Sequence, residues 1–304
     1  MAAWLLAPSV AILALVVVFP LLFALYLSLH QAEPTGGGIT LQWKGLANYT
    51  QFLFHDDLFW PAVRLTLYFT VVSLLIELAL GIGMALVLNQ EFRGRNWVRA
   101  LVLLPWAVPT VVNARMWQWI YAGANYGALN GLMHTLHLLP PQVDKVWLGF
   151  DVPFQSVPIL GALMGWLGAT DALHMIIVAD TWKVTPLVTL LVLAGLQTIP
   201  GSLYEAAQVD GASAWYRLWH ITLPLLRPII LVVLVLRTME LFRVFDIIYI
   251  IMQYSIRVVG VYTFEVGMKF LHFGAGSAMS FLIGLMILGL ALLYVKMLYS
   301  EDSY

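Results

Sequence analysis

The sequence has no cysteine among its 304 residues, which excludes disulfide bonds, thiolate metal sites and cysteine nucleophiles. Charge is also scarce: Asp, Glu, Lys and Arg make up 10% of the chain, against about 25% in a typical soluble domain. The formal net charge is -1, so nothing indicates a surface for nucleic acid. No Gly-x-x-x-x-Gly-Lys-Ser/Thr phosphate loop occurs in the sequence. We therefore do not expect this chain to bind ATP through that motif.

Apolar side chains are abundant instead and account for 62% of the residues. A soluble protein of this size could not cover its surface with so few charges. A membrane-spanning helix needs roughly 20 mostly apolar residues. Six segments meet this requirement, namely 4–29, 65–89, 98–121, 174–198, 225–251 and 275–298. Because backbone polar groups must be paired in lipid, we expect an all-α, polytopic membrane protein with six transmembrane helices.

The density of Lys and Arg sets the expected orientation of the spans. On one side of the membrane Arg93, Arg95, Arg99, Arg217, Arg227 and Lys296 lie in short stretches. On the other side Lys44, Arg64, Lys145, Arg257 and Lys269 are spread over about twice the length, and the higher density is typical of the cytoplasmic side. We therefore expect cytoplasmic N- and C-termini, with a short tail from Tyr299. Residues 1–304 would form a single transmembrane domain with an extended external loop at 122–173.

The polar segment 199–224 carries a pattern, reading Glu-Ala-Ala-Gln-Val-Asp-Gly and, after nine intervening residues, Ile-Thr-Leu-Pro. Ser202 precedes Glu205 by three residues, which predicts a capping box at the start of a helix. Gly211 permits a sharp turn, and Pro224 is expected to stop a second short helix. The pattern therefore predicts a helix-turn-helix that projects from the membrane domain.

This pattern resembles the coupling loop of permease subunits of ATP-binding-cassette importers. In that family the loop docks into a cleft on a separate cytoplasmic ATPase. The matching positions are Glu205, Ala206, Ala207, Gly211, Ile221, Leu223 and Pro224. The resemblance implies a type I importer permease fold with a cytoplasmic coupling loop at 199–224. It assigns ATPase coupling to Glu205, Ala206, Ala207, Asp210, Gly211, Leu223 and Pro224.

The resemblance covers nearly the whole chain and is closest to the carbohydrate branch, in particular the larger membrane subunit of the maltose transporter. The matching stretches are 45–49, 59–60, 93–95, 104–109, 180–186 and 242–246. The resemblance implies a bacterial inner-membrane location, a second homologous permease, two ATPase subunits that hold ATP and Mg²⁺, and an external solute-binding protein. No cofactor is expected in this chain, and no enzymatic activity.

Two segments depart from the family pattern. Residues 252–262 are short and lack the usual Gly-Gly-Pro-rich stretch, which leaves the geometry of the outer gate open. The loop 122–173 is longer than expected and is interrupted by Pro140, Pro141, Pro153 and Pro158. This loop could dock a binding protein or simply pack on the membrane surface.

Ionisable side chains within the spans are costly and usually face a bundle interior or a wet cavity. The fifth span carries Arg237, Glu240, Arg243 and Asp246 at three-residue steps, so the row winds around a helix. Asp180 and Lys183 have the same spacing in the fourth span, and Glu77 lies in the second. Such charges can line a sugar-binding cavity, or they can pair with one another or across helices to hold the bundle together. Pairing is favoured for Arg237–Glu240 and Asp180–Lys183.

Sugars require carboxylate and guanidinium partners together with aromatic faces for stacking. The candidates for the substrate pathway are Asn113, Trp117, Trp182, Glu240, Arg243, Asp246 and Tyr249. No metal site is expected, because His134 and His137 lack a third ligand.

These features together favour a permease subunit that forms half of the pathway of an ATP-driven carbohydrate importer, with a disaccharide such as trehalose or maltose as solute. A permease for a polyol, glycerol phosphate or another small solute stays possible. The alternative from another class is an ion-coupled secondary transporter in which Glu77, Asp180 or Asp246 carries protons. The sequence does not decide which sugar is bound, or whether this subunit or its partner contacts it.

Overall fold

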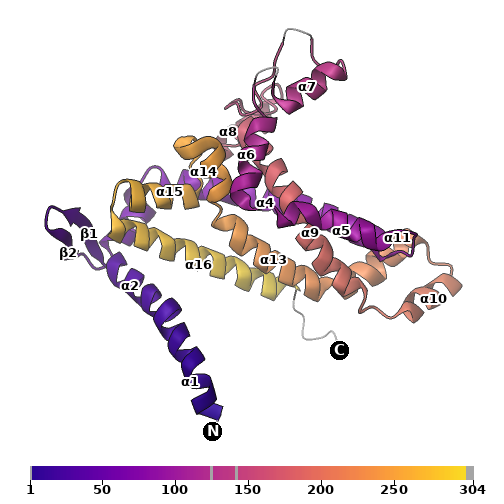
Figure 1. Ribbon diagram of the computed structural model, residues 1–304, viewed down its shortest axis with the longest axis horizontal. Helices are drawn as coiled ribbons and strands as arrows, with labels where there is room; N and C mark the ends of the chain where they lie inside the picture. The colour runs from indigo at the N-terminus through magenta and orange to yellow at the C-terminus, as the bar shows by residue number, and fades with distance from the viewer. Residues whose placement is uncertain (1, 124–125, 141–142, 299–304) are drawn as a thin grey trace. The chain divides into compact units, whose positions relative to one another are not determined.

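The structure is a computed structural model of the chain and describes residues 2–123, 126–140 and 143–298 (Figure 1). The predicted tail from Tyr299 and the predicted loop breaker Pro141 lie outside the described residues. The chain divides into two compact units. One unit comprises residues 1–63 and 257–286, and the other comprises residues 64–256 and 287–304.

The first unit begins with a long apolar helical run. It consists of α1 (Ala2–Leu13), the π-helical segment η1 (Ala14–Val18) and α2 (Phe19–Ser28). Residues Ala7–Ser28 are long and apolar enough to cross a membrane, and none of their most apolar window is buried within the described structure. This run corresponds to the first predicted span.

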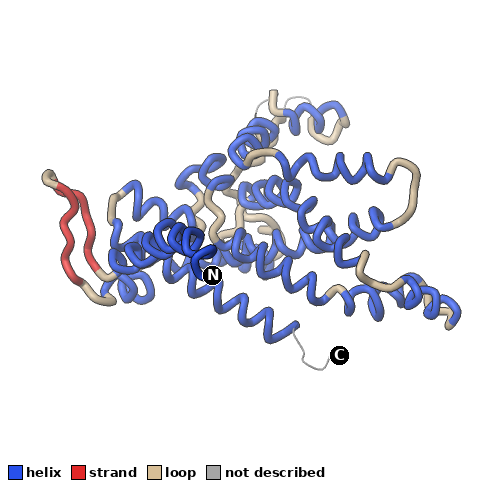
Figure 2. Tube along the Cα trace, turned by 60° about the horizontal axis from the view of Figure 1, so that its bottom comes forward, coloured by secondary structure: helices blue, strands red, loops and turns tan. Residues whose placement is uncertain are grey.

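An antiparallel hairpin follows, formed by β1 (His30–Thr35) and β2 (Gly38–Trp43) and drawn in red in Figure 2. The all-α prediction missed it. In β2 the apolar residues Ile39, Leu41 and Trp43 alternate with Gly38, Thr40 and Gln42, which is the period of a strand. The run is too short and too glycine-rich to stand out beside the long apolar helices.

The rest of this unit is helical. It contains α3 (Ala47–Thr50), η2 (Gln51–His55), α15 (Val259–Phe264), η5 (Glu265–Lys269) and the first turns of α16 (Phe273–Leu298). The buried carboxylate of Glu265 accepts bonds from Arg257 at 2.8 Å and from Lys269 at 3.0 Å. The start of α16 lies against the chain just after α2, where a Cβ on Gly274 would clash with the carbonyl oxygen of His30.

Replacing Gly274 with alanine is therefore expected to destabilise this unit, because the opposing atom belongs to the backbone and cannot rotate away. Overpacking of this kind costs about 1–3 kcal/mol or more. The measurement is the thermal unfolding temperature of the purified protein. Gly284→Ala is the control, since nothing lies within 4 Å of a Cβ at that position of the same helix. Equal unfolding temperatures for the two variants would contradict the close contact.

The second unit is built around α4 (Phe59–Asn89), from Arg64 onward, and α9 (Asp171–Leu196). A Cβ on Gly81 would meet Val188 at 2.6 Å, so these two helices approach closely. Their shared apolar core includes Ala85, Leu88, Val188, Val192, Leu196, Leu226 and Val233.

Across the described chain, four helices are long and apolar enough to span a membrane. The number of candidate spans rises to six if each of two bent helix pairs is counted as one span.

The first bent pair is α5 (Arg95–Ala107) and α6 (Thr110–Ile120), which meet at 90°. Val108 between them is extended, as expected for a residue that precedes a proline. The predicted span 98–121 is therefore not one straight helix. The Leu-Pro-Trp-Ala-Val-Pro stretch that signalled the family resemblance contains this bend.

The second bent pair crosses at 64° and consists of residues 214–225 and 227–255. Its elements are α11 (Ala214–Arg217), η3 (Leu218–Thr222), α12 (Leu223–Leu225), α13 (Arg227–Phe242), α14 (Asp246–Met252) and η4 (Gln253–Ser255). The prediction that Pro224 stops the helix was wrong. Proline near the start of a helical segment loses no internal bond, and the break falls after it, at Leu226. The predicted winding row of charges was also wrong, because α13 ends at Phe242 and α14 begins at Asp246.

The segment between α9 and α11 forms α10 (Gly201–Val209), which projects at the right of Figure 1. The predicted capping box is absent: Pro200 is the N-cap, and no side chain caps the helix. Ser202 lies within the first turn and is not the residue that starts it. Gly211 has φ +77°, so the sharp turn predicted there is confirmed.

The long loop 122–173 contains α7 (Ala128–Thr135) and α8 (Pro158–Leu167). The guanidinium of Arg64 on α4 lies 4.5 Å from the ring of Trp166 on α8, so α8 packs against the start of α4. Asn130 on α7 bonds the backbone of Lys145 and the indole of Trp147. These contacts order much of the loop against its own unit.

Candidate functional site

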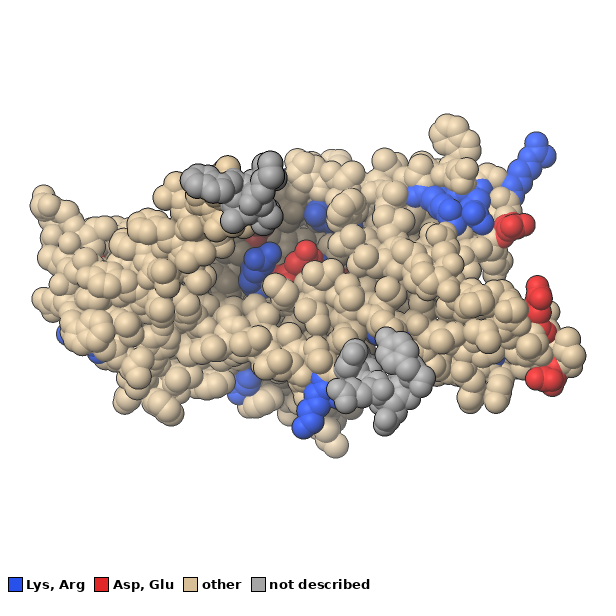
Figure 3. Space-filling model, turned by 90° about the horizontal axis from the view of Figure 1, so that it is seen from below, with Lys and Arg blue, Asp and Glu red and all other residues tan. Residues whose placement is uncertain are grey.

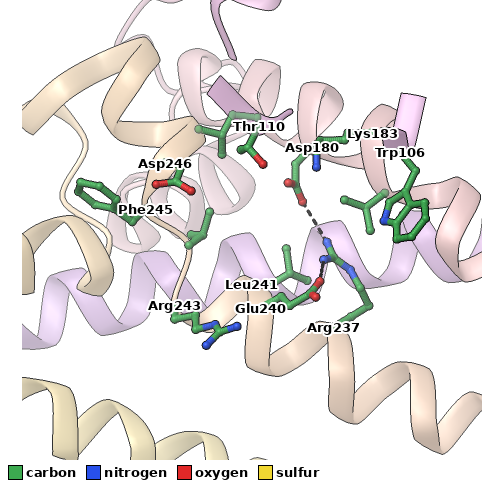
Figure 4. Close-up of a pocket in the computed structure, with 13 residues that line it drawn as sticks. Trp106, Thr110, Asp180, Lys183, Arg237, Glu240, Leu241, Arg243, Phe245 and Asp246 are labelled. Atoms are coloured by element: carbon green, nitrogen blue, oxygen red, sulfur yellow. Dashed lines mark hydrogen bonds and ion pairs between the residues drawn. The ribbon is translucent and has the colours of Figure 1, made fainter. Parts of the chain in front are cut away.

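The second unit contains a cavity of about 500 Å³ that is lined by five helices. Its lining residues are Trp106, Thr110, Asp180, Lys183, Val184, Arg237, Glu240, Leu241, Arg243, Val244, Phe245, Asp246 and Ile247. Figure 4 shows the polar members pointing toward one another from α6, α9, α13 and α14. Two helix breaks border the cavity: α6 begins at Thr110 after the bend that follows α5, and α14 begins at Asp246 after α13 ends at Phe242. Non-helical backbone at membrane depth is tolerated where it lines such a cavity.

Arg237 forms a four-member ion-pair cluster beside the cavity. Its Nε donates to Glu77 Oε2 and its Nη2 to Glu77 Oε1, each at 2.7 Å. Nη2 also donates to Asp180 Oδ2 at 3.1 Å, and Nη1 donates to Glu240 Oε2. Arg237 and Glu77 are buried, with side chains 4% and 0% exposed. This cluster, called the Arg237 cluster below, joins α4, α9 and α13.

The pairing expected for Arg237 and Glu240 is therefore present, and it extends across helices. Asp180 also pairs across helices, with Arg237 and not with Lys183, and within the described chain Lys183 has no ion pair. Arg237 offers several N–H groups in one plane, whereas an ammonium is a point charge on a flexible stem. The guanidinium therefore gathers the carboxylates, and Lys183 remains on the cavity wall.

Three charged side chains of the cavity have no ion-pair partner in the part of the chain that the structure describes, namely Lys183, Arg243 and Asp246. Together with the Arg237 cluster they give four carboxylates and three cations around the cavity, so the charges nearly balance. Trp106 adds an aromatic surface that is 47% exposed. A wall with donors, acceptors and an aromatic face suits a hydroxyl-rich neutral solute.

Of the residues predicted for the substrate pathway, Glu240, Arg243 and Asp246 line the cavity. Tyr249 does not; it stacks on Phe245 with ring centroids 5.0 Å apart and thereby supports the cavity wall from behind. The cavity brings Glu240, Arg243 and Asp246 together, although α13 and α14 are separate helices.

The other three predicted residues form a neighbouring cluster outside the cavity lining. Trp117 and Trp182 meet edge to face at 5.8 Å. Asn113 is fully buried, and its Nδ2 donates to the carbonyl of Ala179 at 3.5 Å. Asn113 and Trp117 follow Thr110 on α6 at one and two turns. This cluster therefore continues the line of α6 away from the cavity.

Sequence reasoning did not place Trp106, Thr110, Asp180, Lys183 and Phe245 among the site residues. Trp106 and Thr110 flank the bend between α5 and α6, and only the bend turns both toward the cavity. The Pro-containing stretch around them was a usable signal, since broken helices in a membrane bundle commonly border a solute site.

The predicted coupling residues fall on two elements. Glu205 and Ala206 are exposed on α10, Ala207 is half-buried, and Asp210 is the C-cap. The turn after it is held by bonds from Gly211 N to Gln208 O at 3.0 Å and from Ala212 N to Ala207 O at 2.8 Å. Leu223 and Pro224 lie on α12. Figure 3 shows charged side chains gathered at its right-hand end, where α10 lies in Figure 1.

Within the described residues, no group of three or more His, Asp or Glu side chains is arranged to hold a metal ion. His134 pairs with Asp144, with 3.0 Å between His134 Nε2 and Asp144 Oδ1.

Comparisons with known proteins agree on one family. The chain is 36% identical over 300 residues to the trehalose/maltose transport system permease protein MalF of Thermococcus litoralis, covering 95% of this chain and 90% of that protein. It is 35% identical over 295 residues to the trehalose transport system permease protein SugA of Mycobacterium tuberculosis, covering 96% and 87%. It is 31% identical to the sulfoquinovosyl glycerol transport system permease protein SmoG of Agrobacterium fabrum, covering 99% and 91%.

Solved structures show the same fold. A chain of a bacterial ABC transporter involved in the import of the acidic polysaccharide alginate superposes with a TM-score of 0.77 at 22% sequence identity. The superposition covers 99% of this chain and 97% of the other. The model of the binding-protein-dependent transport system inner membrane component family matches residues 77–299. These findings confirm the resemblance drawn from the sequence, and the chain belongs to this family of ATP-binding-cassette importer permeases.

Proposed function

We propose that this chain is one of two membrane subunits of an ATP-driven sugar importer of the bacterial inner membrane. The observation that supports this most is a nearly charge-balanced cavity with an aromatic wall in a chain whose relatives are named as trehalose and maltose permeases. The chain would form half of the translocation pathway and bind the sugar in the cavity lined by Trp106, Asp180, Glu240 and Asp246. A second homologous permease would supply the other half.

The proposal includes a coupling role for residues 199–224. Two cytoplasmic ATPase subunits would hold ATP and Mg²⁺, and one of them would receive the exposed face of α10. Closure of the ATPases would move α10 and, through α11 and α12, the start of α13. Glu205 would pair with the ATPase, and the turn at Gly211 would keep α10 in register with α11. An external solute-binding protein would deliver the sugar.

The proposed topology has six spans with both termini in the cytoplasm, in one transmembrane domain over 1–304. Each bent pair then counts as one span. Residues 122–173 would lie outside, together with the hairpin of β1 and β2. The density of Lys and Arg in the short stretches that hold Arg93, Arg95, Arg99, Arg217, Arg227 and Lys296 supports this orientation.

An anionic sugar is the second candidate solute. Lys183 and Arg243 line the cavity without an ion pair in the described part of the chain, and one relative is named for sulfoquinovosyl glycerol. A carboxylate or sulfonate on a sugar would find a guanidinium and an ammonium there. A polyol or glycerol phosphate would use the same groups.

The first experiment is gentle detergent purification of the tagged chain from its native host, followed by mass spectrometry of its companions. We expect a second permease and an ATPase. Purification of the chain alone across several detergents would instead favour an ion-coupled transporter that uses Glu77, Asp180 or Asp246. Uptake of trehalose, maltose and an anionic sugar into proteoliposomes, with and without ATP, then distinguishes the solutes and the energy source.

A further inference from the structure

Glu77 is fully buried on α4 and does not line the cavity, yet it holds a residue that does. Its two carboxylate oxygens accept one N–H each from Arg237 Nε and Nη2, both at 2.7 Å. Two parallel bonds between a planar guanidinium and a carboxylate fix both the position and the plane of the guanidinium. The orientation of Arg237 is therefore set by a residue outside the cavity lining.

The remaining N–H groups of Arg237 then point in fixed directions, because all five lie in one plane. One of them meets Asp180 at 3.1 Å and another meets Glu240. The side chains of Asp180 and Glu240 are 13% and 49% exposed, and both line the cavity. The cluster is therefore a chain of contacts that runs from buried Glu77 through Arg237 to two carboxylates at the cavity wall, as Figure 4 shows for its last two links.

Holding the helices together does not by itself explain this arrangement. A buried ion pair contributes little net stability, and apolar side chains of similar volume often do as well or better. The α4–α9 contact already has an apolar core with Val188 and Ala85. A recognition site, by contrast, needs acceptors held in place before the solute arrives, since ordering them on binding lowers affinity.

We propose that Glu77 is a positioning residue for solute recognition: it orients Arg237, which holds the carboxylates of Asp180 and Glu240 as fixed acceptors for sugar hydroxyl groups. This inference rests on the proposed function, and it adds a residue that no contact with the cavity reveals. Glu77 acts only through Arg237, so its substitution changes how well the solute is bound and leaves the conversion of ATP hydrolysis into transport intact once solute is bound.

The test is the Glu77→Gln variant in the complete importer, reconstituted with its ATPase and binding protein in proteoliposomes and supplied with radiolabelled trehalose or maltose. Glutamine has the shape of glutamate but offers one acceptor and one donor, so it cannot receive both N–H groups. We expect the half-saturating sugar concentration to rise about tenfold, equivalent to about 1.4 kcal/mol. The maximal rate should stay within about twofold.

Two further variants separate geometry from charge and from fold. Glu77→Asp keeps the charge but is one methylene shorter, so it should also raise the half-saturating concentration. Ser73→Ala is the matched control: Ser73 is buried one turn earlier on α4, and its hydroxyl has no partner among the described residues. Its half-saturating concentration should equal that of the wild type.

Should Glu77→Gln fail to assemble, Glu77→Gln/Arg237→Gln removes both buried charges and tests the same point. The positioning role requires the double variant to assemble with a raised half-saturating concentration. Wild-type half-saturation in the double variant, or in Glu77→Gln alone, would show a purely structural pair and overturn the inference. Failure of the wild-type importer to take up either sugar would instead overturn the sugar assignment, and this inference with it.

Discussion

Replacing Arg237 with alanine is expected to lower the unfolding temperature of the chain by about 10 °C and to reduce the yield of folded protein. The substitution leaves Glu77 fully buried without its cation. Breaking a buried pair in this way costs about 3–5 kcal/mol, and each kcal/mol is worth roughly 2–4 °C in a chain of 150–250 residues. The measurement is thermal unfolding of the detergent-purified protein by fluorescence-detected size-exclusion chromatography.

The control is Arg243→Ala, which removes a guanidinium from the same cavity wall where no ion pair exists within the described chain. Its unfolding temperature should change by no more than about 2 °C, as for a substitution away from buried networks. Glu77→Ala combined with Arg237→Ala should recover much of the lost stability, because the unpaired charge is removed. Wild-type stability of Arg237→Ala alone would mean that Glu77 is not held by this pair.

Replacing Gly211 with aspartate is expected to uncouple ATP hydrolysis from sugar uptake or to prevent assembly with the ATPase. Gly211 has φ +77°, where L-residues carry a strain of roughly 1–2 kcal/mol. The new carboxylate would also follow Asp210 at the C-terminal end of α10, where the helix dipole disfavours negative charge. The turn that sets the position of α10 is therefore altered in shape and in charge.

Sugar uptake and ATP hydrolysis of the reconstituted importer are the readouts, and uptake should fall at least tenfold, a coupling loss of about 1.4 kcal/mol or more. Gly201→Asp is the matched control: it makes the same change at the start of α10, where φ is not positive, no atom lies within 4 Å of the new Cβ, and the dipole favours a carboxylate. Normal uptake by Gly211→Asp would remove the proposed docking role of this turn.

The spans were predictable because the requirement for about 20 apolar residues leaves a strong signal in composition. The breaks within two of them were not, because Phe242 to Asp246 contains neither proline nor glycine. Near Val108 the prolines were visible, yet a proline within a span signals a bend without its angle. The start of α10 was misplaced since Ser202 and Glu205 fit a capping box in spacing alone, whereas Pro200 begins the helix.

Part of the site was also predictable from composition, because charged residues stand out in an apolar span. Glu240, Arg243 and Asp246 stood out as charges within an apolar span. The partner choices of Arg237 did not follow from the sequence, because Glu77 and Asp180 lie on other helices, 160 and 57 residues away. Contacts of that separation depend on helix packing, which local periodicity does not fix. The place of Trp106 in the cavity did not follow from the sequence, because Pro105 and Pro109 indicate a bend beside it but not the 90° angle that turns it inward.

We expect the two breaks beside the cavity, at Val108 and at residues 243–245, to differ in stiffness, which hydrogen exchange can measure. Val108 precedes Pro109, which disfavours the helical conformation at Val108, and the ring of Pro109 locks its own φ. Arg243, Val244 and Phe245 have no such restriction. We expect amide exchange at residues 243–247 to change when ATP and sugar are added to the importer. Exchange at residues 110–113 should stay constant, and equal responses at both breaks would contradict the difference.

We therefore expect one wall of the cavity to be rigid and the opposite wall to move. The rigid wall contains Trp106 and Thr110, which flank the bend between α5 and α6. The movable wall contains Arg243 and Asp246, which lie at the break between α13 and α14, and α13 follows α12 in the chain. A movement transmitted along α13 would therefore change the contacts to the solute on one wall only. The opposite wall would stay in place and keep the orientation of the proposed sugar while its surroundings change.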